Sequence, residues 1–135
     1  MHTPATKAAR LTSVAIAYVG RLDQISAVRA DLRGLLNGCP IGDDIVLCTS
    51  ELAANAVVHS YSGNPRGTFT VHAEVATGDY TWIEVQDDGG PWTALPNDSG
   101  RPHGLAIVAA LASDWGIDGD YRTRTAWARF DWPAT

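Results

Sequence analysis

The sequence has few of the residues on which several classes of protein depend. Lysine occurs once, at Lys7, and the rest of the ten basic residues are arginines scattered along the chain. Fifteen acidic residues outweigh them, which gives a net charge of −5. A general nucleic-acid-binding protein needs a basic surface for phosphates. The charge distribution therefore argues against nucleic acid as a partner.

Long apolar runs and cysteine frameworks are also lacking. No stretch approaches the roughly 20 apolar residues that a membrane span needs, and residues 1–4 do not begin a signal peptide. The two cysteines, Cys39 and Cys48, are too few for a disulfide framework and do not have metal-ligand spacing. We therefore expect a cytoplasmic protein without a membrane association.

The 135 residues, 45% of them apolar, suit one compact domain. Residues 1–10 are small and polar, and we expect them to be disordered. From residue 11 on, the pattern predicts this order of elements: a strand at 11–19, helices at 22–36 and 43–60, strands at 68–75 and 80–86, a helix at 104–111, and strands at 115–118 and 126–132.

Helical spacing is clearest at Leu22, Ile25, Val28 and Leu32. Short turns join the strands that follow residue 66, and such turns connect antiparallel neighbours. The sequence thus predicts an α/β fold, a two-layer sandwich with helices on one face of a mixed, mostly antiparallel sheet.

Three segments carry side chains that a purely structural role does not readily explain. Glu51 and Asn55 lie four residues apart on one helix face, and His59 roughly continues that line. Asp87, Asp88 and Gly89 follow where a strand is predicted to end, and glycine there lets a ligand approach the backbone.

The third segment, residues 103–108, begins a helix with His103 and Gly104, so phosphates can approach the free N–H groups. Each segment alone also has an ordinary interpretation: a solvated helix face, a turn, or a helix start without a ligand. All three in this order are much less expected by chance.

On these residues the sequence resembles the GHKL (Bergerat-fold) ATP-binding domains of gyrase, MutL and histidine kinases. Within that group it is most similar to the small bacterial anti-sigma-factor serine/threonine kinases and their stand-alone relatives. The resemblance covers about residues 12–132, so residues 11–135 are expected to form a single histidine-kinase-like ATP-binding domain. The motif Glu51…Asn55…His59 matches the family's N box, and this is its most specific part.

The resemblance implies roles at the phosphates of ATP. Asn55 would hold Mg²⁺, for which an amide oxygen is a suitable hard ligand. Glu51 would be the catalytic base that polarises the attacking hydroxyl or water. Gly104 and Leu105, in the second glycine box at 103–108, would face the phosphates. His59 is expected to pack near the helix end rather than to catalyse.

The resemblance also implies roles at the adenine. Asp87, in the first glycine box, would accept a hydrogen bond from the adenine amino group. Gly89 would keep the adenine pocket open, and Thr125 on the terminal strand would support the same adenine edge.

The sequence departs from the family pattern around the ATP lid, which the resemblance places at residues 92–101. Pro91 and Pro102 stand where the glycine boxes often have glycine. Proline lacks an N–H donor and fixes φ, so part of the phosphate cradle is missing. Arg101 is the one basic residue of that loop. Two alternatives stay open for it: it contacts the γ-phosphate, or it is an exposed loop arginine.

The resulting expectation is an ATP- and Mg²⁺-binding serine/threonine kinase that acts on an anti-sigma-factor antagonist and so controls a sigma factor. The main alternative is a non-catalytic nucleotide-binding or partner-sequestering module of the same fold. A detached histidine-kinase catalytic domain is the weakest reading, because no dimerisation helices with an acceptor histidine are found. The oligomeric state stays open, with a homodimer as an option.

Overall fold

The computed structural model describes residues 10–58, 64, 67–89, 103–120 and 122–134. The predicted 1–10 segment lies outside this part except for Arg10. The elements follow the predicted order: β1 (Leu11–Val19), a short 3₁₀ helix η2 (Leu22–Gln24), α1 (Ile25–Leu35), α2 (Gly42–Val58), β2 (Thr68–Ala76), β3 (Tyr80–Asp87), α3 (His103–Leu111), β4 (Asp114–Gly119) and β5 (Arg124–Asp131).

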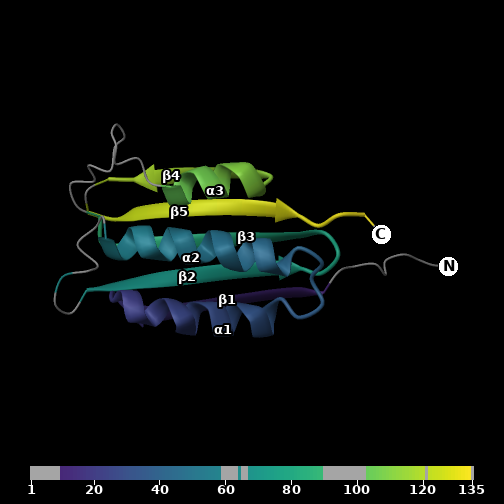
Figure 1. Ribbon diagram of the computed structural model, residues 1–135, viewed down its shortest axis with the longest axis horizontal. Coiled ribbons are helices and arrows are strands. Elements are labelled where there is room, and N and C mark those ends of the chain that lie inside the picture. The colour runs from purple at the N-terminus through teal and green to yellow at the C-terminus, as the bar shows by residue number, and fades with distance from the viewer. Residues whose placement is uncertain (1–9, 59–63, 65–66, 90–102, 121, 135) are drawn as a thin grey trace.

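The five strands form one open sheet in the order β1-β2-β3-β5-β4, which Figure 1 shows from bottom to top. All four pairings between these strands are antiparallel. The helices lie on one face of the sheet (Figure 1). The predicted α/β two-layer sandwich is thus confirmed, and its sheet is antiparallel throughout these pairings.

The helices cover the sheet because their apolar side chains recur at helical spacing. In α1 the buried residues are Ile25, Val28 and Leu32, three and four residues apart. The longer α2 lies over the middle of the sheet and buries residues on most of its circumference. The core between the layers includes the fully buried side chains of Phe69, Phe130, Ile45, Leu52 and Ile83.

Polar side chains fix the two long helices laterally. The Tyr18 hydroxyl of β1 donates a hydrogen bond of 2.7 Å to Asp31 of α1. The Arg29 guanidinium of α1 donates to the Ser50 hydroxyl of α2 at 3.0 Å, and that hydroxyl donates to the Val46 carbonyl at 2.8 Å. These contacts set the position of α2, which carries the candidate site residues.

The last strand begins earlier than its composition suggests. The sequence predicts a strand at 126–132, whereas β5 begins at Arg124. The reason is tertiary, because β3 continues to Asp87 and the pairing of the two strands extends to Asp87 opposite Arg124. Among the helices of the described part of the chain, none is long and apolar enough to cross a membrane.

Candidate functional site

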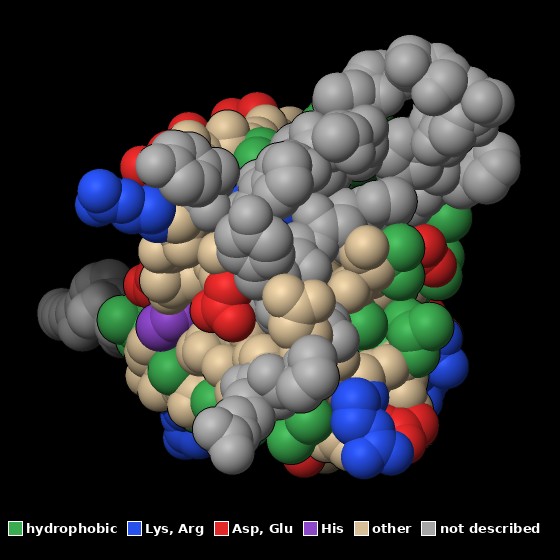
Figure 2. Space-filling view, turned by 90° about the vertical axis from the view of Figure 1, so that its left-hand side faces the viewer, with side chains coloured by type: hydrophobic (Ala, Val, Ile, Leu, Met, Phe, Trp, Pro, Cys, Tyr) green, Lys and Arg blue, Asp and Glu red, His purple; other side chains and the backbone are tan. Residues whose placement is uncertain are grey.

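Four elements bring their ends together at one end of the molecule, the left-hand end in Figure 1. Here β3 ends, β5 begins, α2 reaches its C-terminal turn and α3 starts. The antiparallel sheet causes this, since the end of one strand meets the beginning of its neighbour. Figure 2 views this end, where the visible basic side chains lie apart rather than in one patch.

A buried ion pair joins the two central strands at this end. Asp87 and Arg124 are register partners, and each is 8% exposed. The Arg124 Nε and Nη2 atoms donate to Asp87 Oδ2 at 3.4 and 3.3 Å. Charges are rarely buried unless paired, because leaving water is costly. The pair therefore places two opposite charges in the interior at this end of the sheet.

The second carboxylate oxygen of Asp87 is held by the backbone. The Gly89 N–H donates to Asp87 Oδ1 at 2.7 Å. Gly89 has a φ of 72°, in the left-handed region that glycine adopts readily. Burial raises the pKa of the Asp87 carboxyl, although the Gly89 N–H and the Arg124 guanidinium both act to lower it.

A small pocket lies beside this ion pair, between the helices and the sheet. Its volume is about 20 Å³, and its lining residues are Leu52, Asn55, Leu105, Ile117, Arg124 and Ala126. A cavity of that size has room for about one water molecule. The pocket combines an apolar lining with an amide and a guanidinium.

Asn55 brings an unsatisfied polar group to this pocket. Its Nδ2 atom is buried and has no hydrogen-bond partner. Most buried polar atoms are paired, so an unpaired donor in a pocket indicates a place for a ligand with acceptor atoms. Glu51 lies one turn earlier on the same helix, is half-buried and is not part of the pocket lining.

The structure brings five of the predicted site residues to this end, with Asn55 in the pocket lining, and separates Thr125 from it. Asp87 and Gly89 form the turn after β3, Leu105 lines the pocket, and Gly104 lies in the first turn of α3. Thr125 follows Arg124 in a strand, where successive side chains point to opposite faces. Thr125 therefore lies on the face of the sheet opposite Asp87, and the pocket side of β5 is formed by Arg124 and Ala126.

Other predicted features lie outside the described residues. They are His59, the lid at 92–101 with Arg101, and the two prolines Pro91 and Pro102.

A family model of the histidine kinase-like ATPase domain matches residues 7–129. The chain belongs to this family, the GHKL ATPases. Membership of this family implies that the domain binds ATP. No curated protein sequence matches the chain significantly.

Among solved structures, the chain is similar to part of the structure of the RsbU and RsbW domains of Rv1364c from Mycobacterium tuberculosis. The two share 27% sequence identity with a TM-score of 0.71, over 91% of this chain. The chain spans about a third, 34%, of the length of that structure.

The residues of this GHKL domain fit a magnesium ion only if the nucleotide supplies most of its ligands. Within the described residues, no group of three or more His, Cys, Asp or Glu side chains is placed to hold a metal. Mg²⁺ commonly keeps several waters and binds through one or two protein oxygens plus substrate phosphates. Asn55, an amide on the wall of the pocket, suits that limited role.

Arg124 is the site residue that sequence reasoning missed. It lies directly before Thr125, and an arginine there is unremarkable in a sequence with many scattered arginines. The signal that would have found it is the alternation of β5 counted back from the buried Phe130 and Ala128, which places residue 124 on the inner face.

Proposed function

We propose that this GHKL domain binds ATP with Mg²⁺ and transfers the γ-phosphoryl group to a serine or threonine of a partner protein. The proposed partner is an anti-sigma-factor antagonist, so that the reaction controls a sigma factor. The observation that carries the proposal is the unsatisfied Nδ2 donor of Asn55, which suits a ligand with acceptor atoms, in a pocket beside the buried Asp87 carboxylate. Family membership and the anti-sigma-factor kinase resemblance support the choice of reaction.

In this proposal each residue has a distinct task. Asp87 accepts a hydrogen bond from the adenine amino group, and Gly89 holds the carboxylate in position through its N–H. Leu52 of α2 and Leu105 of α3 supply apolar contacts for the adenine ring. Asn55 provides an oxygen for the metal, which when bound neutralises phosphate charge.

Glu51 is the proposed base. The acceptor's hydroxyl oxygen forms a bond to the γ-phosphorus, the bond from phosphorus to the β-phosphate oxygen breaks, and ADP leaves. The hydroxyl proton passes to the Glu51 carboxylate. Glu51 lies one helical turn from Asn55 on the same face of α2, which supports a position near the metal-bound phosphates.

One observation favours a second candidate, a partner-sequestering module that does not turn over ATP. The pocket beside Asp87 has only about 20 Å³, and the Arg124 side chain lines it. Such a module would bind its protein partner whether or not nucleotide is present, and it would need no base at Glu51.

A phosphotransfer assay separates the two candidates. Antagonist domains found by affinity capture are incubated with the parent protein and labelled MgATP, and Glu51→Gln is compared with Asp44→Asn, an exposed acid on the same helix. We expect Glu51→Gln to bind MgATP like the parent and to transfer phosphate about 10²–10⁴-fold more slowly, as for loss of a positioned base. Asp44→Asn should transfer phosphate normally.

Two further results would redirect the proposal. A parent that is saturated with MgATP and stably bound to its partner, yet transfers no phosphate, would leave only the sequestering module. Unchanged ATP affinity in a folded Asp87→Asn variant, measured by calorimetry, would show that Asp87 does not bind the adenine. A charge-assisted hydrogen bond contributes about 1.5–3 kcal/mol, so we expect a clear loss instead.

A further inference from the structure

The oxygen of Asp87 that points to Arg124 is already engaged. Both guanidinium contacts, at 3.4 and 3.3 Å, go to Oδ2, while Oδ1 accepts the Gly89 N–H. A base amino group that approaches this carboxylate therefore meets a donor of the same kind at the same place. Each carboxylate oxygen can accept more than one hydrogen bond, so what the guanidinium denies the adenine amino group is the space beside Oδ2.

The volume beside the ion pair leads to the same conclusion. Pockets that hold small-molecule ligands commonly measure about 300–1,000 Å³. The pocket here has about 20 Å³, and the Arg124 side chain forms part of its wall on the sheet side. Since Arg124 is 8% exposed, its side chain occupies interior space rather than extending into solvent. A volume of this size does not admit a purine ring, so a lining side chain has to move, and Arg124 is the longest of those that line the pocket.

The ion pair is suited to being exchanged. Charge-assisted hydrogen bonds between nitrogen and a carboxylate are commonly about 2.7–2.9 Å long, and both Arg124 contacts are longer. The Gly89 contact, at 2.7 Å, lies within that range. The Gly89 N–H thus stays on Oδ1, while a base amino group that takes the place of the longer guanidinium contacts at Oδ2 keeps the carboxylate paired.

We propose that Arg124 determines the nucleotide affinity of this domain by closing the pocket that receives the adenine base. In the nucleotide-free protein the guanidinium occupies Asp87 Oδ2 and the space of the base, and nucleotide binding exchanges Arg124 for the base amino group. This inference rests on the proposed function, because it assumes that Asp87 receives the base. Only the fraction of molecules with Arg124 displaced binds nucleotide, so the apparent affinity is lowered by that fraction.

The experiment compares variants that open the pocket with a matched control. Arg124→Thr removes the guanidinium and suits a strand, and Arg124→Gln keeps a donor for Asp87 without the charge. Arg122→Thr makes the same change at an exposed arginine two residues away. ATP binding is measured by calorimetry at pH 8, with and without Mg²⁺, because a high pH favours the ionised form of the Asp87 carboxyl, whose pKa burial raises.

We expect Arg124→Thr to bind ATP about tenfold more tightly than the parent, and Arg124→Gln to lie between the two. The gain should appear without Mg²⁺ as well, because the exchange concerns the base rather than the phosphates. Arg122→Thr should bind like the parent. Arg124→Gln provides the answer alone if Arg124→Thr does not fold.

Equal or weaker ATP binding by both Arg124 variants would overturn the inference, and would indicate that Arg124 helps to hold the base. That outcome leaves ATP binding by the parent, and hence the proposed function, in place. If neither the parent nor either Arg124 variant binds ATP, both the inference and the nucleotide-dependent proposal are wrong.

Discussion

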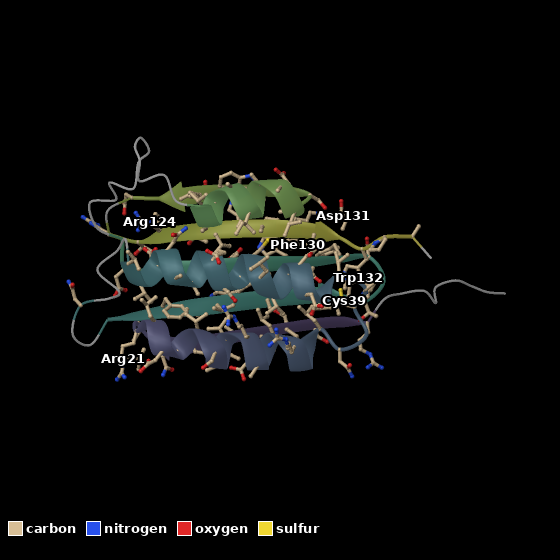
Figure 3. All side chains as sticks on the ribbon, in the orientation of Figure 1. Arg21, Cys39, Arg124, Phe130, Asp131 and Trp132 are labelled. Carbon is tan, nitrogen blue, oxygen red and sulfur yellow. The ribbon has the colours of Figure 1, made fainter. Side chains whose placement is uncertain are left out.

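The strand β5 carries an arginine–aspartate pair near each of its ends, and the two pairs differ in almost every respect. Arg124 and Asp87 meet where β5 begins, while Arg129 and Asp131 meet where it finishes. Figure 3 labels Arg124 and Asp131 at these two ends. The exposed pair has the better geometry, with Arg129 Nε and Asp131 Oδ1 2.7 Å apart, against 3.3 Å in the buried pair. Side-chain exposure is 41% and 56% in the Arg129–Asp131 pair, and 9% and 8% in the Arg124–Asp87 pair.

The comparison teaches that hydrogen-bond length alone does not rank ion pairs. In the exposed pair, water solvates both charges, so forming or breaking the contact changes little. Arg129 also lies over the Tyr80 ring, 4.6 Å from its centroid, and keeps a contact without Asp131. In the buried pair, losing one member leaves the other in a poorly solvated site. Replacing a buried ion pair by apolar residues is often neutral or stabilising, so a buried pair beside a pocket is better explained by a binding role than by stability.

The largest expected effect tests this ranking directly. Arg124→Thr should lower the free energy of unfolding at pH 7 by about 3 kcal/mol, the low end for a broken buried pair, because Asp87 is left without its cation. Arg129→Thr should leave stability nearly unchanged. Urea unfolding followed by tryptophan fluorescence measures both. Equal losses from the two variants would show that the burial of the Arg124–Asp87 pair has no energetic consequence.

A domain of ordinary stability, about 5–15 kcal/mol, remains folded after such a loss. The binding experiment on Arg124→Thr is therefore feasible, and it predicts a variant that is less stable and yet binds ATP more tightly. A simple structural role for Arg124 predicts that both quantities worsen together.

The next effect concerns Asn55, which lines the pocket together with Arg124 at the buried end of β5. Asn55→Ala should weaken MgATP binding by about tenfold, roughly 1.4 kcal/mol, and metal-free ATP binding much less. An amide that holds Mg²⁺ matters only when the ion is present. Calorimetric titrations with Mg²⁺ and with EDTA measure the difference. Equal losses under both conditions would assign Asn55 a structural role in α2.

The smallest effect is the pH dependence of the buried pair. Burial raises the pKa of Asp87 above the ordinary value of 3.8 despite the nearby guanidinium. The folded protein thus binds the proton more tightly than the unfolded chain does. The resulting stabilisation is present below the ordinary pKa and is lost as pH rises through the raised pKa.

Carboxyl carbon NMR titration of Asp87 measures this pKa directly, and Asp87→Asn identifies the signal. In Arg124→Thr the pKa should rise further, because a cation that favours the charged form is gone. A pKa below the ordinary value in the parent would show that the attraction of Arg124 outweighs burial, and that the guanidinium is held more firmly than the exchange requires.

The N-box helix was predictable because its evidence is local. The four-residue spacing of Glu51 and Asn55 places both on one face of any helix, and α2 forms as its composition indicates. The turn after β3 was predictable for the same reason, since an aspartate followed closely by glycine favours a tight turn at a strand end. Roles for these residues in catalysis and binding remain predictions.

The part of the site on β5 was not predictable in the same way. From composition alone the strand is predicted to begin at residue 126, and Thr125 before it could then face the pocket. Pairing with β3 begins the strand at Arg124, which sets the alternation and places Thr125 on the opposite face. A single choice of register thus decides which of two neighbouring side chains belongs to the site.

The sequence by itself determined the elements, their order and the helix face that carries Glu51 and Asn55, because periodicity and turn residues act within a few positions of one another. Only the tertiary structure decided that Arg124 meets Asp87 across a separation of 37 residues and that Arg124 lines the same pocket as Asn55. The physical reason is that antiparallel pairing aligns strands by their hydrogen bonds and buried faces. Those constraints become definite only when the whole sheet is assembled.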